Sequence, residues 1–488
     1  MLNFDIKIFL FKIDIFIAGA YYKKEDIMTE QEKLRLYTSI KPSNRQLIVQ
    51  NMKFYAFVHY TVNTFTGKEW GNGKESETLF NPTRQDTDQW CEAIASAGMK
   101  GLILTCKHHD GFCLWQTETT NHSVRNSPYK NGKGDVVKET AESCKKYGLK
   151  FGVYLSPWDR NSEFYSTEKY NDFYIKQLTE LLTNYGEIFM LWLDGACASS
   201  KDGKPKQIYD FERIYRTAYE LQPDICISGT APDIRWVGNE SGKCRKSEWN
   251  VVPLFDFANQ NIENNCQDTE DFKKFQKRCV SVMQQDLGSR KALENHTKLT
   301  WYPAEVDVSV RPGWFYHKSE DFLVKSLKRL MTIYYDSVGS NGLLLLNIPP
   351  NRNGLLSKKD VKRLKEVGYW LDKEKQLKLN NICVNEIGKT EHGYEYLLTF
   401  DKQCIDRIRM EEDTSFSQRA ESFTIYNVDE NCRKIYTGTV IGFGKIAIFR
   451  PQTASALKIV IDKCRLEPHI KLFEVYATGA YRIKKRKK

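Results

Sequence analysis

Apolar runs of strand length alternate with helical stretches after residue 50, and this alternation limits the possible fold more than any other feature. Runs that are apolar almost throughout are typical of strands buried on both faces of a parallel sheet. The expected strands are 54–59, 101–107, 151–156, 188–193, 225–228, 300–306 and 343–348. Helical patterns cover 86–97, 135–147, 169–185 and 211–221, and each has Gly or Pro just past its end, where helices commonly stop.

Repeated strand–helix units in a chain of 488 residues predict a (β/α)8-like, TIM-type barrel, with one or two helices replaced by loops. An open doubly wound sheet is the alternative. It is less favoured because no GxGxxG or GxxxxGK motif follows any expected strand.

The pattern changes near residue 377, where helical runs give way to short alternating strands at 394–400, 422–426, 434–440, 445–449 and 456–461. Turn-forming residues separate these strands, which indicates an antiparallel β-sandwich. We therefore expect an N-terminal extension over 1–45, a barrel over 46–375, a C-terminal β-sandwich over 376–480 and a basic tail over 481–488.

Charge and composition limit the partners of the chain. The net charge is +11, but six of the positive charges lie in the last seven residues, so the remainder is only mildly basic. Without basic and aromatic residues interleaved elsewhere, we expect no nucleic-acid partner. No segment is apolar over the length that a membrane span needs, so we expect no membrane partner either. The number of subunits is left open.

Two features bear on localisation. The 13 cysteines are an odd number with no CxxC pair, which is typical of free thiols in a reducing compartment. Apolar residues 8–17 precede Ala18-Gly19-Ala20, as in a signal peptide, but Lys12 and Asp14 interrupt the apolar run. We expect a cytoplasmic protein, or a periplasmic, lysosomal or secreted one if residues 1–20 act as a signal peptide.

Polar and aromatic residues gather where the expected strands end. In a parallel barrel these ends open on one face, where reacting groups meet. The clusters are His59-Tyr60, Lys107-His108-His109-Asp110-Gly111, Tyr154 with Pro157-Trp158-Asp159, Trp192-Leu193-Asp194-Gly195, Arg235-Trp236-Val237-Gly238-Asn239-Glu240, and Glu305 and Asp307 with Arg311-Pro312-Gly313-Trp314. This one-sided accumulation predicts an enzyme.

Asp194 is the most informative of these residues. It closes an apolar strand and is followed at once by Gly195, which leaves room for a ligand against the backbone. A carboxylate in such a place is costly to bury without a partner, although Asp is also common in turns after strands.

Two carboxylates, several histidines and tryptophans, and no cofactor fingerprint fit glycoside hydrolysis, which needs one carboxylate as nucleophile and one carboxyl as proton donor. Asp194 is the expected nucleophile. Spacing alone does not separate Glu240 from Glu305 as the acid, although a donor on a loop slightly favours Glu240. His108 and His109 could also bind a metal ion, but hydrogen bonding to sugar hydroxyls fits better, and we expect no metal and no cofactor.

These segments, together with Gly67-Lys68-Glu69-Trp70-Gly71, resemble the alpha-L-fucosidases of glycoside hydrolase family 29 over residues 50 to 350. The resemblance implies a retaining mechanism with Asp194 as nucleophile and Glu240 as acid/base. It also implies the subfamily that prefers alpha-1,3 and alpha-1,4 fucosyl linkages, with fucosylated oligosaccharides or glycoconjugates as partners. By the same resemblance, the β-sandwich over 376–480 is expected to be discoidin-like. The residues that would contact fucose are His59, Glu69, Trp70, His108, His109, Tyr154, Trp192, Arg235 and Trp314. A broad-specificity fucosidase, or a carbohydrate-binding protein without activity, is the alternative.

Overall fold

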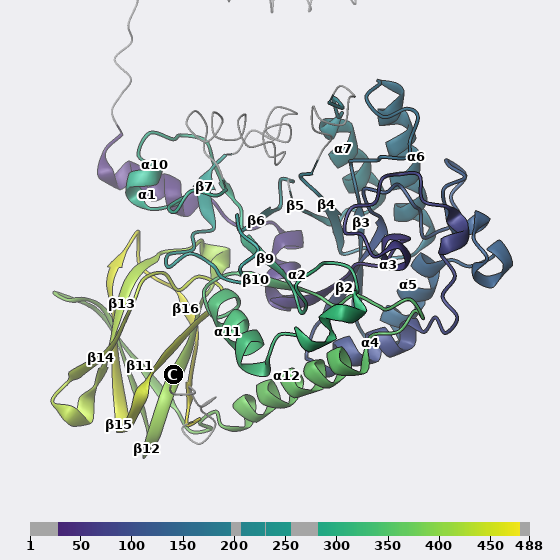
Figure 1. The fold of residues 1–488 in the computed structure, drawn as a ribbon. Helices are drawn as coiled ribbons and strands as arrows, with labels where there is room; N and C mark the ends of the chain where they lie inside the picture. The colour runs from purple at the N-terminus through teal and green to yellow at the C-terminus, as the bar shows by residue number, and fades with distance from the viewer. Residues whose placement is uncertain (1–27, 197–205, 230, 255–281, 479–488) are drawn as a thin grey trace, which may run out of the picture.

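The computed structural model describes residues 28–196, 206–229, 231–254 and 282–478. The predicted basic tail and residues 1–27 of the predicted extension lie outside these ranges. Eight parallel strands close into a barrel in the order β1-β10-β9-β6-β5-β4-β3-β2, as expected from the sequence (Figure 1). They are β1 (Phe54–Val58), β2 (Gly101–Lys107), β3 (Lys150–Leu155), β4 (Met190–Leu193), β5 (Cys226–Gly229), β6 (Ile234–Trp236), β9 (Ala304–Ser309) and β10 (Leu343–Asn347).

Two strands differ from the expectation. β6 is only three residues long and lies where the sequence indicated a loop. The expected strand 300–306 is divided: β8 (Leu299–Trp301) pairs with β7 (Val251–Pro253) outside the barrel, and β9 begins after Pro303. Pro303 has no N–H to donate, so a continuous ladder cannot pass through it.

Helices surround the barrel, and the four that were expected end within one or two residues of their predicted limits. The helices are α1 (Glu30–Ser39), α2 (Asn44–Met52), α3 (Asn63–Thr66), α4 (Thr87–Ser96), α5 (Val136–Lys146), α6 (Lys169–Asn184), α7 (Phe211–Leu221), α10 (Arg290–Leu293), α11 (Leu327–Ser337) and α12 (Lys358–Gln376). Side chains of Asp86 and Asp135 cap the N-termini of α4 and α5, since each accepts a hydrogen bond from a backbone N–H of the first turn.

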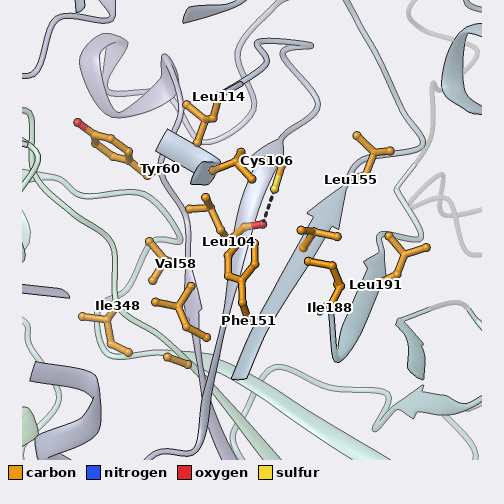
Figure 2. Packing of buried hydrophobic residues seen from close by; sticks show 14 of the residues in the cluster. Val58, Tyr60, Leu104, Cys106, Leu114, Phe151, Leu155, Ile188, Leu191 and Ile348 are labelled. Atoms are coloured by element: carbon orange, nitrogen blue, oxygen red, sulfur yellow. Dashed lines mark hydrogen bonds between the residues drawn. The ribbon is translucent and has the colours of Figure 1, made fainter. Parts of the chain in front are cut away.

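Alternate residues along each strand face opposite sides of the barrel wall. Figure 2 shows the outer side, where Leu104, Phe151 and Leu191 of neighbouring strands pack together under the helices. The inner side carries a smaller cluster that includes Phe57, Tyr154 and Trp192. Residues two positions further along a strand continue on the same side, so the last inward residues of each strand reach the mouth of the barrel.

Helix α2 closes the opposite end of the barrel. Its residues Val49 and Met52 belong to the inner cluster, and the Gln46 side chain donates hydrogen bonds to the carbonyls of Asp233 and Trp301 at 2.7 and 2.9 Å. The barrel interior is therefore packed, and only its mouth is free to hold a ligand.

Six antiparallel strands follow α12 and form the expected β-sandwich beside the barrel (Figure 1). They are β11 (Cys383–Thr390), β12 (Gly393–Glu412), β13 (Ala420–Asn427), β14 (Arg433–Gly438), β15 (Lys445–Cys464) and β16 (Ile470–Tyr476). The 20-residue strands β12 and β15 pair with each other along most of their length. β12 also pairs with β11 near its start and with β16 near its end, and the second half of β15 pairs with β13. The two segments predicted at 445–449 and 456–461 are thus one strand.

No helix within the described ranges is long and apolar enough to cross a membrane.

Candidate active site

A cavity of about 470 Å³ opens at the mouth of the barrel. Both predicted catalytic residues and all the predicted binding residues except Tyr154 and Arg235 line it. The lining residues are Phe57, His59, Glu69, Trp70, His108, His109, Trp192, Asp194, Gly195, Ala196, Gly229, Trp236, Glu240, Met283, Asp307 and Trp314. The strand-end pattern therefore located the cavity correctly.

Asp194 follows β4 two positions after the inward-facing Trp192, so its carboxylate points into the mouth of the barrel. Oδ2 accepts a hydrogen bond from the Tyr154 hydroxyl at 3.0 Å, and Oδ1 accepts one from the Ala196 backbone N–H at 2.8 Å. The side chain remains 26% exposed. Asp194 is thus held in one orientation while its carboxylate is still open to a ligand.

Glu240 lies on the loop that follows β6, at the rim of the same cavity. Partial removal from solvent and the nearby charge of Asp194 raise the pKa of Glu240, and a hydrogen bond from the Trp314 side chain lowers it in part. A carboxyl with a raised pKa holds its proton closer to neutral pH, as a proton donor requires.

Glu305, the alternative acid, does not line the cavity. It lies inside the barrel, 1% exposed, and accepts hydrogen bonds from the Tyr55 hydroxyl, the Trp192 indole at 2.7 Å and the Ser228 hydroxyl at 2.8 Å. Burial raises the pKa of Glu305, and these three donors oppose the rise. Glu305 therefore supports the Trp192 indole from inside the barrel and is itself out of reach of a ligand in the cavity.

Tyr154 and Arg235 are the two predicted binding residues that the structure places elsewhere. Tyr154 is fully buried and acts on Asp194 through its hydroxyl. Arg235 is also fully buried, and its guanidinium donates to the Glu248 carboxylate and to the carbonyls of Tyr302 and Trp249 at 2.9 Å. Because Ile234 and Trp236 of β6 face the barrel interior and its mouth, alternation turns Arg235 to the outside. The expected contact between Arg235 and a sugar is therefore corrected.

Glu69 connects two loops at the cavity wall. One of its oxygens accepts the Trp314 backbone N–H at 2.8 Å, and the other accepts from the His317 Nε2 at 2.7 Å. The loop approaches so closely that a Cβ at Gly313 would lie 2.6 Å from this carboxylate. Glu69 therefore fixes the place of Trp314, whose side chain in turn contacts Glu240.

Two histidines of the cavity can be assigned a tautomer from their partners. Ser156 donates its single hydroxyl hydrogen to the Trp158 carbonyl at 2.7 Å, so it must accept from the His109 Nδ1 at 2.7 Å. Asn347 donates its NH₂ group to the Trp314 carbonyl at 2.8 Å, so its oxygen accepts from the His59 Nδ1 at 2.8 Å. In both rings the proton is on Nδ1 and Nε2 carries the lone pair; the His109 Nε2 lies 3.8 Å from Asp194 Oδ2.

Asp307, Trp236, Met283 and Phe57 also line the cavity, although no role was predicted for them. Asp307 is 4% exposed and accepts the Trp236 indole N–H at 2.8 Å. Burial, followed by the charge of Glu240, raises the pKa of Asp307 well above its ordinary value. Alternation along β9 would have found it, since Asp307 lies two residues beyond the inward Glu305.

Over the residues that the structure describes, no three His, Cys, Asp or Glu side chains are placed to hold a metal ion together.

Known proteins resemble this chain over nearly its whole length. A family model described as alpha-L-fucosidase matches residues 22–376. Alpha-L-fucosidase 1 of Arabidopsis thaliana is 37% identical over 469 residues, which cover 89% of this chain and 87% of that protein. A solved structure assigned as an alpha-L-fucosidase of Bacteroides ovatus has a TM-score of 0.85 and 43% identity, and covers 94% of this chain and 78% of that one. A family 29 fucosidase of Ruminococcus gnavus, solved with fucose, has a TM-score of 0.75 and 26% identity, and covers 90% and 95%.

We expect His59 and His109 to be uncharged, with the proton on Nδ1, in the folded protein at pH values above about 5. Burial lowers the pKa of His59 to about 3 and that of His109 to about 4. The unfolded chain takes up these protons near pH 6.5, so the free energy of unfolding should fall as the pH drops from about 6.5 toward 4. Nitrogen-15 NMR of labelled imidazoles measures both the tautomer and the titration. Protonation of either ring near pH 6.5 in the folded protein would contradict the assignment.

Proposed function

Because this chain belongs to the alpha-L-fucosidase family of glycoside hydrolases, we propose that it releases alpha-1,3- or alpha-1,4-linked L-fucose from glycans with retention of configuration. The observation that carries the proposal is the pairing of Asp194 and Glu240 in one cavity. They come from separate elements, β4 and the loop after β6, and can lie on the two sides of one glycosidic bond.

In the first step Asp194 attacks the anomeric carbon of fucose, and the bond between that carbon and the departing oxygen breaks. Glu240 gives its proton to this oxygen, so the leaving sugar departs neutral. The product is a fucosyl ester of Asp194, which needs the two carboxyl groups to lie about 5–5.5 Å apart.

In the second step Glu240, now a carboxylate, removes a proton from water, which attacks the anomeric carbon and releases Asp194. The electrostatics of the site support this change of role. The charge of Asp194 raises the pKa of Glu240 in the free enzyme. Esterification removes that charge and so lowers the pKa of Glu240. Its ionised form is then favoured, and this carboxylate can accept a proton from water.

The cavity also suits the shape of fucose, which has an apolar methyl group and several hydroxyls. Three aromatic rings in the cavity lining contact one another through Phe57: its ring is tilted against Trp192, with ring centres 5.2 Å apart, and meets Trp314 edge to face at 6.4 Å. His59, His109 and Glu69 bring polar atoms to the same space. This mixture of apolar walls and directed polar groups is typical of sugar recognition.

Asp194→Gly should lower turnover by at least about a thousandfold, because no other carboxylate is held at that position. Azide should restore part of the activity with an activated aryl fucoside, since the small anion can attack in place of the missing side chain. Release of nitrophenol and formation of fucosyl azide are measured. Full activity of the variant without azide would remove the role assigned to Asp194.

Glu240→Ala should lower hydrolysis of a glycan by about 10² to 10⁴, because a poor leaving group needs a proton. With a nitrophenyl fucoside the first step should survive and the second should slow, so an initial burst is expected and azide should accelerate turnover. Glu305→Ala is the comparison: it removes support from Trp192 and should reduce both steps without a burst. The reverse pattern would make Glu305 the acid.

The linkage preference is tested with a Lewis trisaccharide, whose fucose is alpha-1,3- or alpha-1,4-linked, against an alpha-1,2-fucosyl trisaccharide. We expect kcat/KM to be at least about tenfold higher for the Lewis trisaccharide, as the subfamily resemblance implies. The Asp194→Gly protein, prepared in the same way, controls for contaminating enzymes. Equal rates would indicate a broad-specificity fucosidase.

A further inference from the structure

Three charged side chains are buried together beside the loop that carries Glu240. Arg235 and Glu248 are completely buried, and Arg245 is 9% exposed. The Glu248 carboxylate pairs with the Arg235 guanidinium, and its Oε2 lies 3.3 Å from Arg245 Nη1. The same Oε2 accepts the backbone N–H of Arg245 at 3.0 Å. We name this group the Arg235–Glu248–Arg245 triad.

The triad links the barrel strand β6 to the loop that follows it and carries Glu240, which we call the acid loop. Arg235 is part of β6, whose neighbours in the barrel are β5 and β9, so its backbone is fixed by strand pairing on both sides. Glu248 and Arg245 belong to the chain that follows, after the turn that contains Glu240. A rigid strand thus holds both ends of a loop whose middle reaches the cavity.

Arg245 also connects the loop that carries Glu240 to the segment around Met283. Its guanidinium donates to the Val237 carbonyl at 3.0 Å, to the Gln284 carbonyl at 2.6 Å and to the Val282 carbonyl. Val237 precedes Glu240 by three residues, and Val282 and Gln284 flank Met283, which lines the cavity. One side chain therefore ties two backbone segments that each contribute to the active-site cavity.

The two segments are in direct contact at Gly238. Its φ angle is +96°, and a Cβ there would lie 2.7 Å from the Val282 carbonyl oxygen. Only a glycine permits this approach, because the backbones meet with no side chain between them. The position of the acid loop is therefore set by backbone contact and by the Arg245 hydrogen bonds together.

Charge keeps the triad intact under acid conditions. Burial alone would raise the pKa of Glu248, but the guanidinium groups of Arg235 and Arg245 lower it more, so its pKa lies below the ordinary value. Glu248 consequently stays ionised when the pH falls to the range in which a protonated Glu240 is needed. Neutralising it would leave two buried guanidinium groups without their shared partner.

We propose that the Arg235–Glu248–Arg245 triad positions Glu240 for proton transfer, with Arg245 as the positioning residue that sets its distance from the leaving-group oxygen. The inference rests on the proposed function, in which Glu240 is the acid/base. The loop is also held further along, where Arg329 Nη2 donates to the Ser241 carbonyl at 2.7 Å, but this bond does not involve the segment around Met283.

The test uses the full chain with Arg245→Lys, Arg245→Met and Glu248→Gln, each assayed with a Lewis trisaccharide and with a nitrophenyl fucoside. A misplaced Glu240 slows the first step only for the substrate whose leaving group needs a proton, whereas it slows the second step for both substrates. We expect kcat/KM to fall by about 10- to 100-fold with the trisaccharide and by less than about threefold with the nitrophenyl fucoside. Azide should raise kcat of the variants with the nitrophenyl fucoside, and Arg245→Lys should lie between the wild type and Arg245→Met.

Glu374→Gln is the matched control. Glu374 is an 11% exposed carboxylate on α12 that pairs with Arg407 of β12 at 3.0 Å, and it does not line the cavity. Its loss should lower the thermal midpoint without changing the ratio of the two substrates. If Glu248→Gln does not fold, Arg245→Lys keeps the charge and provides the same ratio.

Two outcomes would overturn the inference: equal losses on both substrates without a response to azide, or unchanged rates on both. The Glu240→Ala variant is measured alongside to separate the two proposals. If Glu240→Ala shows no dependence on the leaving group, the proposed function fails. If it does and the Arg245 variants do not, only the positioning role fails.

Discussion

Alternation of side chains along the strands of a closed parallel barrel is the constraint on which the site depends. Each strand sends every second side chain toward the barrel axis, and the last of these reaches the mouth. This relation connects Phe57 with His59, Trp192 with Asp194 and Glu305 with Asp307. The upper member of each pair lines the cavity; Phe57 and Trp192 reach it as well, whereas Glu305 stays in the packed interior. The reacting groups are therefore held by the same pairing that closes the barrel.

Carboxylates occur at two depths of the barrel and serve different purposes. Glu305 lies in the packed layer and accepts hydrogen bonds from three donors, one of which is the Trp192 indole. Asp194, Asp307 and Glu240 lie above it, around the cavity. Burial, followed by the charge of a neighbouring carboxylate, raises the pKa values of both Glu240 and Asp307.

The sequence was sufficient for the barrel, most of its strands and nearly all of the residues that meet at its mouth. It failed where a local pattern was too short or ambiguous. β6 has three residues, fewer than periodicity can reveal, and missing it concealed that Arg235 faces away from the cavity. The choice between Glu240 and Glu305 needed depth along the barrel axis, which spacing does not contain. In the sandwich, β15 was predicted as two strands because Arg450 and Pro451 interrupt its apolar pattern.

The tautomers of His59 and His109 make both rings hydrogen-bond acceptors toward the cavity. Each ring donates its single N–H, on Nδ1, to a protein acceptor, so the other ring nitrogen, Nε2, can act only as an acceptor. The carboxylates of Asp194 and Glu69 likewise offer oxygen acceptors. A guest molecule is therefore met mostly by groups that receive protons and must itself supply them. Neutral polyols satisfy this requirement through their hydroxyls, whereas an ether oxygen or a fluorine facing these four groups brings them no proton to accept.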